Sequence, residues 1–380
     1  MSRFFDLVSK PARNMGRYAS SPLPQQAASG AQPRLIRLDS NENPYGPAPL
    51  AITAMRNALA AASVYPDDDC GELRRKLATS HGLPVEQVLV TAGSTALLGL
   101  LCQTLLAPGL NAVTSERSFI VYSMAVHATG AQLIETPMRD DSFDPGAILD
   151  VIDANTRLIF LANPNNPTGT VLESATVEKF LTLVPDHVVV ILDEAYYEFA
   201  MYFASLRKAA YSNSVAYVKR GASVVVLRTF SKAHGLAGLR VGYGIGPAEL
   251  LGYCARMRNT FSVSSVAQAA ALAAIDDHSH VERVVANNAV QAKLLTEGLT
   301  EFGYRVTPTA ANFVYCDVRG DASVIAQRLS EEGVSVRPLG AWGARNCIRV
   351  SIGTPEQNQL FLQAVRNITA HNTSQPATRR

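Results

Sequence analysis

The chain has 380 residues, 47% of them hydrophobic, which is enough to bury a large core and predicts two domains. Its 34 Lys and Arg against 32 Asp and Glu leave a net charge of +2 without a basic block, which argues against nucleic acid or a membrane surface as a partner. The five scattered cysteines form no Cys-x-x-Cys pair, so neither a disulfide framework nor a zinc site is predicted, and a reducing, cytoplasmic location is favoured. No apolar stretch approaches the roughly 18 residues that a membrane-spanning helix needs.

The two ends of the chain differ from its body. Residues 1–37 carry six Lys or Arg and one Asp but lack the apolar segment of a secretory signal. We interpret them as an arm that packs on a partner and against the smaller domain, with a targeting peptide as the alternative. Residues 369–380 are predicted to form a frayed tail.

From about residue 88 to 245, short apolar runs alternate with helical stretches and with Gly, Pro and Asn turns. Runs this short, without polar alternation, are typical of a mostly parallel sheet that helices cover on both faces. We therefore predict a large α/β domain over 38–263. Its expected strands are 88–90, 158–161, 188–192, 224–227 and 241–245.

The remainder of the chain predicts a smaller α+β domain over 264–368. It is Ala-rich and helical from about 264 to 302, and Gly303 ends that helix. Strands are expected at 312–315, 333–337 and 347–352. The last helix begins near Thr354, a suitable N-cap that Pro355 follows.

One segment at a strand end carries unusual chemistry. Residues 229–240 read Thr-Phe-Ser-Lys-Ala-His-Gly-Leu-Ala-Gly-Leu-Arg, directly after an apolar run. A lysine in a dry pocket has a lowered pKa and attacks carbonyls, and hydroxyls with a guanidinium bind phosphate. Lys232 with Thr229, Ser231 and Arg240 therefore indicates a pocket for pyridoxal 5'-phosphate. The alternative is a solvated loop lysine.

Asp193 ends a run of five apolar residues, where a buried carboxylate needs a partner. A protonated pyridine nitrogen is such a partner, and Tyr196 would reach the O3′ atom of the same ring. The alternative for Asp193 is an ordinary helix N-cap.

Three further segments are candidates for cofactor contact. Asn166 lies in the double-proline turn Asn-Pro-Asn-Asn-Pro-Thr-Gly at 163–169, where its amide would donate to the ring hydroxyl. Gly93, Ser94 and Thr95 open a helix whose free N–H groups form an anion site. Phe119 would stack on the ring face. A plain turn, an ordinary helix start and a core aromatic are the respective alternatives.

Two arginines are candidates for substrate contact. Arg349 faces oppositely to its apolar neighbours in a short strand, and Arg337 lies in another. Arginine binds carboxylate or phosphate through two N–H groups, so two of them suit a divalent anion. Internal salt bridges are the alternative. His278 and His280 are interpreted as part of a polar loop between helices, and no metal is predicted.

Together these segments resemble the fold-type I pyridoxal-phosphate-dependent aminotransferases of class I and II, and within them the histidinol-phosphate aminotransferases. The resemblance spans nearly the whole chain from Leu38. The superfamily is marked by the segment of Lys232, the turn at 163–169, Asp-Glu-Ala-Tyr at 193–196 and Arg-Val-Ser-Ile-Gly at 349–353. Leu-Asp-Ser-Asn-Glu-Asn-Pro-Tyr-Gly-Pro at 38–47 and Tyr-Pro-Asp at 65–67 narrow it to the family.

The resemblance implies a homodimer with active sites at the subunit boundary, histidinol phosphate as amino donor and 2-oxoglutarate as acceptor. Lys232 would form the Schiff base, and Asp193 would pair with the pyridinium nitrogen. The implied contacts to the cofactor phosphate are Ser94, Thr229, Ser231, Arg240 and, from the other subunit, Tyr65. Asn166 and Tyr196 would contact the O3′ atom of the ring. The implied substrate contacts are Arg349 and Arg337, with Asn43 and Tyr18 as further candidates.

The chain departs from the family in three places. Arg117-Ser118-Phe119 stands where Pro-Thr-Tyr is common, the segment after Gly93 lacks an acidic residue, and Tyr18 lies farther from Asn41 than usual. These departures leave the reaction class intact and bear on the substrate. An aromatic amino-acid aminotransferase and a threonine-phosphate decarboxylase are therefore alternatives. A non-catalytic cofactor-binding regulator is a remote one, because residues 1–37 carry no helix-turn-helix pattern.

Overall fold

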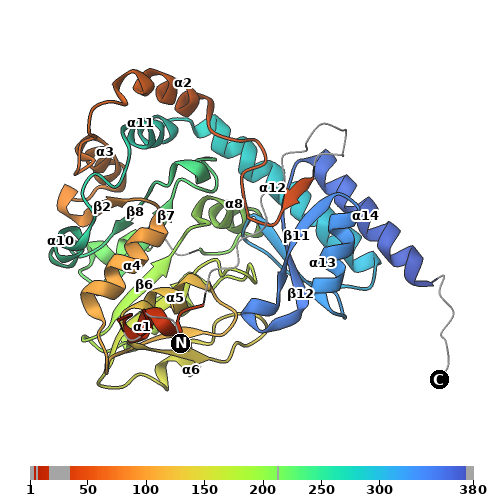
Figure 1. The fold of residues 1–380 in the computed structure, drawn as a ribbon, viewed down its shortest axis with the longest axis horizontal. Coiled ribbons are helices and arrows are strands. Elements are labelled where there is room, and N and C mark those ends of the chain that lie inside the picture. The colour runs from red at the N-terminus through yellow and green to blue at the C-terminus, as the bar shows by residue number, and fades with distance from the viewer. Residues whose placement is uncertain (1–3, 6, 17–34, 212–213, 374–380) are drawn as a thin grey trace.

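The structure, a computed structural model, describes residues 4–5, 7–16, 35–211 and 214–373. Figure 1 shows two parts, a larger one built on a seven-stranded sheet and a smaller one built on a five-stranded sheet. We call them the large and the small domain. The five cysteines are buried and free of disulfides.

The large sheet has the strand order β2-β8-β7-β6-β5-β3-β4. Its strands β7, β6, β5, β3 and β4 run parallel, and β8 is antiparallel to both of its neighbours. Before their polar carboxyl ends, the central strands β6 and β7 consist of Val, Ile and Leu, nearly all of them buried, as expected for a covered parallel sheet. The predicted α/β class is confirmed. The strands are β2 (Val88–Thr91), β3 (Asn111–Ser115), β4 (Gln132–Thr136), β5 (Thr156–Ala162), β6 (Val189–Asp193), β7 (Val224–Thr229) and β8 (Gly242–Ile245).

Helices follow most strands of the large sheet. Those of the large domain are α2 (Pro49–Ala58), α3 (Gly71–His81), α4 (Ser94–Leu105), α5 (Val121–Ala128), α6 (Pro145–Leu149), α7 (Ser174–Leu183), α8 (Tyr197–Arg207), α9 (Val215–Lys219), α10 (Ala248–Met257) and α11 (Ser265–Ala274). Because α4, α8 and the turn after β7 all start at the carboxyl ends of strands, their first residues meet at one edge of the sheet.

The small sheet has the order β1-β11-β12-β10-β9. Its first strand, β1 (Ile36–Leu38), precedes the large domain in sequence yet pairs in parallel with β11. The others are β9 (Arg305–Thr307), β10 (Phe313–Asp317), β11 (Val334–Leu339) and β12 (Ala344–Ser351), with helices α13 (Ala322–Glu331) and α14 (Pro355–Thr373). The segment after β1 therefore crosses from the small domain into the large one.

Helix α12 (His278–Glu301) connects the two domains. Its Leu295 and Leu299 lie in the core of the small sheet. Helix α11 lies within the predicted small domain of 264–368, but Ala267 and Ala271 pack into the core of the large sheet, and α11 contacts α2. The domain limits stay a prediction, and this packing favours a boundary near the start of α12.

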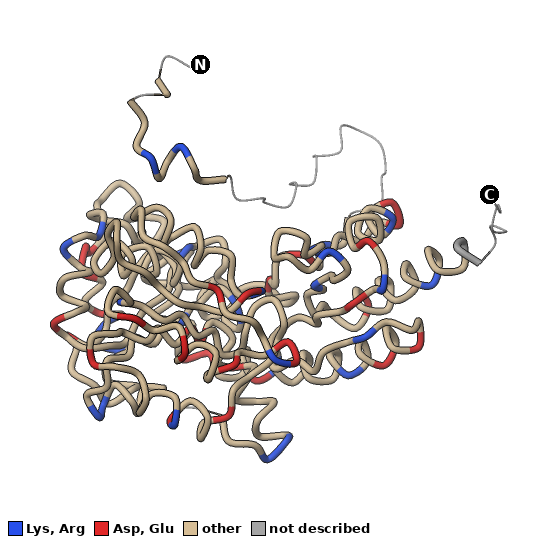
Figure 2. Tube along the Cα trace, turned by 90° about the horizontal axis from the view of Figure 1, so that it is seen from below, with Lys and Arg blue, Asp and Glu red and all other residues tan. Residues whose placement is uncertain are grey.

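In the described part of the N-terminal arm, α1 (Lys10–Asn14) lies beside α5 of the large domain, whereas Ile36 and Arg37 of β1 pair with β11 of the small domain. Residues 17–34, and Tyr18 with them, lie outside the described residues. Of the predicted tail, residues 369–373 continue helix α14 rather than fraying, and residues 374–380 lie outside the described residues. Figure 2 shows Lys and Arg interspersed with Asp and Glu along the chain.

Within the described ranges, no helix is both long enough and apolar enough to cross a bilayer. Among the same residues, His, Cys, Asp and Glu side chains form no group of three or more that could hold a metal ion. His280 is buried at the start of α12, and its Nε2 atom lies 3.4 Å from Asn43 Nδ2.

Candidate functional site

A cavity of about 270 Å³ lies between the carboxyl edge of the large sheet and the small sheet. It brings together residues that are far apart in sequence. Among the sequence-predicted residues, the cavity is lined by Ser94, Thr95, Phe119, Asn166, Asp193, Tyr196, Thr229, Ser231, Lys232, Arg240, Arg337 and Arg349.

Lys232 projects into this cavity from the turn after β7. Its Nζ atom donates to the carbonyls of Asn41 (3.1 Å) and Ser40 (3.4 Å) and lies 5.7 Å from the centre of the Tyr196 ring. Burial, and then the positive charge of Arg349, lower the pKa of Lys232 to about 7. A substantial fraction of this amine is therefore neutral near pH 7, as a nucleophile requires.

Asp193 ends β6 on the same cavity and is almost fully buried. Its Oδ2 atom accepts a hydrogen bond from the Tyr122 hydroxyl (2.8 Å), and its Oδ1 atom accepts one from the Ala195 N–H (3.1 Å). Burial raises the pKa of Asp193 to about 6, although both hydrogen bonds act in the opposite direction. A cationic group in the cavity would stabilise the ionised form.

The start of α4 forms the floor of an anion cradle. Gly93, with a φ of 84°, precedes the helix, and a Cβ atom there would lie 2.5 Å from Arg240 Nη2. A Cβ atom on Gly242 would lie 2.6 Å from the Ser94 nitrogen. Glycine at both positions therefore allows β8, Arg240 and the free N–H groups of α4 to approach closely. Ser231 completes the cradle, since its Oγ atom accepts from Thr229 Oγ1 (3.0 Å) and from Arg240 Nη1 (3.4 Å). Hydroxyls, a guanidinium and a helix N-terminus are the ligands of a phosphate.

The small sheet supplies the two arginines. Arg349 and Arg337 lie directly opposite each other on the antiparallel strands β12 and β11. Arg349 donates from Nη1 to Asn166 Oδ1 (2.6 Å) and from Nη2 to the Asp39 carbonyl (2.8 Å), while Arg337 Nε donates to the same carbonyl (3.4 Å). Two adjacent guanidinium groups make this side of the cavity strongly positive and suitable for an anionic substrate.

Three sequence-predicted residues within the described part of the chain do not line the cavity. Gly93 lies just behind it as the residue before α4. Asn43 Nδ2 donates to the carbonyl of Ala233, next to the cavity lysine (2.8 Å). Tyr65 is 78% exposed and stacks on Phe261 at 4.6 Å between ring centres. Tyr18 lies outside the described residues.

Sequence reasoning missed several lining residues, among them Tyr122, Asn41, Ser40 and Glu42. Tyr122 stands three residues after Phe119, in the first turn of α5, and no local pattern marks its contact with Asp193. The Asn41 side chain donates to the Tyr196 hydroxyl (3.0 Å), so Asn41 supports a residue that was predicted.

Comparison with known proteins gives a consistent result. The sequence model of the family described as aminotransferase class I and II matches residues 33–365. Histidinol-phosphate aminotransferase 2 of Pseudomonas aeruginosa is 40% identical over 375 residues, which are 98% of this chain and 100% of that protein. Histidinol-phosphate aminotransferase of Moorella thermoacetica is 39% identical over 337 residues, 88% and 86% of the two chains.

Solved structures agree with the sequence comparison. Histidinol-phosphate aminotransferase from Sinorhizobium meliloti, in complex with pyridoxal-5'-phosphate, matches with a TM-score of 0.82 at 29% identity over 88% of this chain and 92% of that one. A Thermus thermophilus aspartate aminotransferase shares the fold, with a TM-score of 0.81 at 24% identity over 95% of this chain and 99% of that one.

Proposed function

Because this chain belongs to the class I and II aminotransferase family, we propose that it transfers the amino group of histidinol phosphate to 2-oxoglutarate, as a step of histidine biosynthesis. Pyridoxal phosphate is the proposed cofactor. The observation that carries the proposal is the lining of a single cavity by Lys232, Asp193 and the arginine pair. The relatives named for this reaction, which align over nearly the whole chain, support the choice of substrate.

The residues of the cavity fit this cofactor. The cradle of Ser231, Arg240 and the α4 N-terminus suits a phosphate group, and a Cβ atom on Gly242 would clash with its backbone, while one on Gly93 would displace the Arg240 guanidinium. Asp193 is a buried carboxylate whose hydrogen bonds come from a neutral hydroxyl and a backbone N–H, and it suits a pyridinium nitrogen. When bound, pyridoxal phosphate supplies an aldehyde for amines and a ring that withdraws electrons from the substrate Cα–H bond.

In this proposal each side chain has a defined task. Lys232, with its pKa near 7, would anchor the cofactor as a neutral amine, and its Nζ atom would later accept the substrate Cα proton and pass it to the cofactor rather than back to Cα. Asp193 holds the proton on the ring nitrogen and so keeps the ring cationic. Asn166 and Tyr196 orient the ring through its oxygen, and Phe119 covers one face.

The arginine pair is proposed to bind the anionic end of each substrate. Histidinol phosphate carries a phosphate dianion, and 2-oxoglutarate carries a second carboxylate. Arg349 and Arg337 would bind either of them in the same place, because a guanidinium group recognises both anions. One pocket then serves both half-reactions.

We further propose a cytoplasmic homodimer. The five buried, free cysteines fit a reducing compartment. Tyr65 is exposed near other exposed apolar side chains, Val64 and Phe261, and such a cluster suits contact with a second copy. Tyr65 would then reach the cofactor phosphate of the partner.

Substrate comparison tests the proposal. The holoenzyme is expected to show its highest kcat/KM with histidinol phosphate, with phenylalanine and phosphothreonine well below it. Faster turnover of phenylalanine would identify an aromatic aminotransferase, and release of CO₂ from phosphothreonine would identify a decarboxylase. Failure of all three amines to change the cofactor absorbance would favour a non-catalytic regulator. Lys232→Ala serves as the inactive control.

A further inference from the structure

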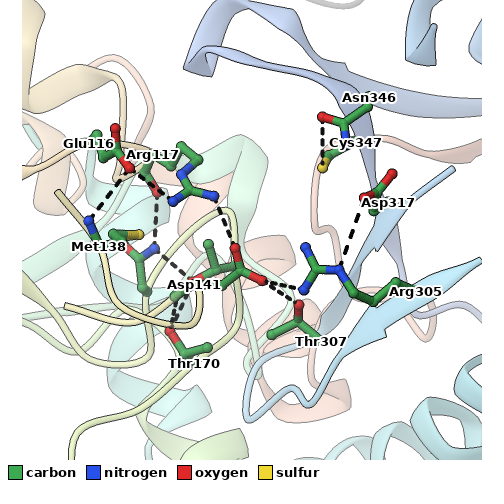
Figure 3. A network of polar contacts seen from close by, with 12 residues as sticks. Glu116, Arg117, Met138, Asp141, Thr170, Arg305, Thr307, Asp317, Asn346 and Cys347 are labelled. Carbon is green, nitrogen blue, oxygen red and sulfur yellow. Dashed lines mark hydrogen bonds and ion pairs between the residues drawn. The ribbon is translucent and has the colours of Figure 1, made fainter. Parts of the chain in front are cut away.

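Asp141 joins the two domains, because it lies between Arg117 on one side and Arg305 and Thr307 on the other (Figure 3). Only 5% of the side chain of Asp141 is exposed. Its Oδ1 atom accepts from Arg117 Nη1 of the large domain (3.0 Å). Its Oδ2 atom accepts from Arg305 Nη1 and Thr307 Oγ1 of the small domain (both 2.9 Å). One buried carboxylate thus receives donors from both domains.

On the large-domain side, Asp141 belongs to a closed ring of hydrogen bonds. Thr170 Oγ1 donates to the Asp141 carbonyl (2.9 Å) and bonds to Thr168 Oγ1 (2.9 Å). Asn165 Nδ2 donates to Thr168 Oγ1 (2.9 Å) and to the Arg117 carbonyl (3.1 Å). The Arg117 side chain closes the ring by donating to the carboxylate of Asp141. This ring fixes the turn of 163–169 against the segment of Arg117.

Two cavity residues stand directly beside that ring. Phe119 follows Ser118, whose Oγ atom donates to Asn165 Oδ1 (2.9 Å). Asn166 follows Asn165, and its Oδ1 atom accepts from Arg349. The ring therefore holds the wall of the cavity that faces the cofactor ring in the proposed function.

On the small-domain side, Asp141 binds β9, where Thr307 is the first of a row of residues that lie opposite one another across the small sheet. Thr307 of β9 lies opposite Tyr315 of β10, Tyr315 lies opposite Arg349 of β12, and Arg349 lies opposite Arg337 of β11. Opposed residues of neighbouring strands share one face of a sheet, with strands about 4.8 Å apart. Thr307 is thus two strands away from Arg349, on the same face.

We propose that Asp141 is a positioning residue that sets the distance between the substrate-binding arginines and the wall formed by Phe119 and Asn166. This inference rests on the proposed function, because it assigns the arginine pair to the substrate anion. Asp141 holds Thr307 and Arg305 at one end of the row and the ring of hydrogen bonds at the other. When this contact is lost, the small sheet can move relative to the large domain. A substrate whose anionic end is bound by Arg349 then no longer fits the cavity.

The test removes only the cross-domain half of the contact. The double variant Arg305→Met, Thr307→Val leaves Asp141 paired with Arg117, so the large-domain ring stays intact. The small domain keeps other contacts to the large one, since Ala310 N–H donates to the Gly169 carbonyl and Arg207 Nη2 donates to the Thr309 carbonyl (both 2.8 Å). Arg305 is 52% exposed, so its replacement leaves no buried cavity.

Two readouts are measured on the holoenzyme. The dissociation constant of succinate, a dicarboxylate that cannot react, is expected to rise about tenfold, which corresponds to roughly 1.4 kcal/mol. The KM for histidinol phosphate is expected to rise by a similar factor while kcat changes less than about threefold, because ground-state binding is what is lost. The absorbance spectrum and affinity of the cofactor should stay unchanged.

Arg220→Met is the control for the loss of a surface arginine, since Arg220 is 59% exposed, close to the 52% of Arg305, and pairs with Glu178 (3.1 Å) inside the large domain. It should change neither constant. Asp141→Asn keeps the shape of the side chain and removes its charge. This variant should also raise the dissociation constant of succinate. Unaltered succinate binding and KM in the double variant would overturn the proposal, even if the protein melted at a lower temperature, since Asp141 would then be merely structural. A parent enzyme inactive on histidinol phosphate would instead refute the proposed function.

Discussion

At the scale of single residues, burial shifts two pKa values in opposite directions within one cavity. It lowers the pKa of Lys232 to about 7 and raises the pKa of Asp193 to about 6, because burial always disfavours the charged form. The lysine is thereby prepared as a nucleophile. The ionised form of Asp193 becomes more favourable when a cationic ring binds beside it, since the two opposite charges then stabilise each other.

Replacement of Tyr122 by Phe should make the ionised form of Asp193 less favourable. It deletes the hydroxyl that donates to Asp193 and keeps the ring that stacks on Phe160 at 4.7 Å between ring centres. The pKa of Asp193 should then rise above about 6, because the lost hydrogen bond favoured the carboxylate. Measured by fluorescence titration near pH 7, the dissociation constant of pyridoxal phosphate should rise about tenfold.

The cofactor-free protein provides a second readout for Tyr122→Phe. The pKa of Asp193 in the folded protein, about 6, lies above the ordinary value of 3.8 for an aspartate, so the folded protein binds the additional proton. The contribution of Asp193 to stability is therefore present at low pH and is lost as the pH rises from about 4 through 6. In the variant this loss should extend to higher pH. Urea unfolding between pH 4 and pH 8 checks it, and superimposable pH profiles would contradict this account of Tyr122.

The structure brings together the predicted residues whose chemistry and chain position coincide, while their roles stay predictions. Lys232 and Asp193 each follow an apolar strand, and polar residues at the ends of parallel strands meet at one edge. Tyr122 was missed because its contact with Asp193 joins residues 71 positions apart, which no local pattern encodes. The roles assigned to Tyr65 and Tyr18 stay predictions.

At the scale of elements, the approach of β8 to α4 determines the shape of the anion cradle. Strand 241–245 was expected from its apolar residues, but its direction was not, because an apolar run looks the same in both orientations. Its antiparallel pairing with β7 and β2 brings Gly242 against the start of α4. Helix α11 was expected in the small domain from its place in the chain, whereas its alanines pack into the core of the large sheet.

Gly242→Ala should open the cradle. The added Cβ atom would lie 2.6 Å from the Ser94 nitrogen and 3.0 Å from the Arg228 carbonyl, and both are backbone atoms that cannot rotate away. Strand β8 must then move from α4, and the affinity for pyridoxal phosphate should fall at least about tenfold, with a Tm lower by several degrees.

Gly252→Ala is the control for this substitution. Gly252 is exposed within α10, and a Cβ atom added there would have no other atom within 4 Å. Alanine is favoured over glycine in a helix by about 1 kcal/mol, so this variant should keep its cofactor affinity and gain stability. Equal cofactor affinity in Gly242→Ala and Gly252→Ala would show that close packing of β8 on α4 is unimportant for the cradle.

At the scale of the whole molecule, the cavity lies where two sheets meet, and each sheet supplies a different part. The large sheet carries Lys232 and Asp193, and the small sheet carries the arginine pair. Sequence patterns predicted both domains and assigned Lys232 and Asp193 to one cofactor ring, but they did not show how the arginine pair is placed relative to these two residues. The relative placement of two sheets depends on contacts such as those of Asp141, which are neither periodic nor local.

The proposed dimer makes a prediction about mixed subunits. Lys232→Ala and Tyr65→Ala are each expected to impair the enzyme as pure dimers at limiting cofactor. If Tyr65 serves the partner's site, a mixed dimer has one doubly defective site and one intact site. Refolding the two variants together should then restore about a quarter of the parent activity, since random pairing makes half of the dimers mixed. No recovery would place Tyr65 at the site of its own subunit, and full activity of Tyr65→Ala by itself would place Tyr65 outside both sites.

The central claim is that the ε-amine of Lys232 holds the cofactor covalently beside Asp193. Borohydride reduction of the holoenzyme, followed by peptide mapping with mass spectrometry, tests it most directly. The account predicts a single pyridoxyl-phosphate label on the peptide that contains Lys232, and no fixed label in Lys232→Ala. A label on another lysine, or equal labelling of the two proteins, would contradict it.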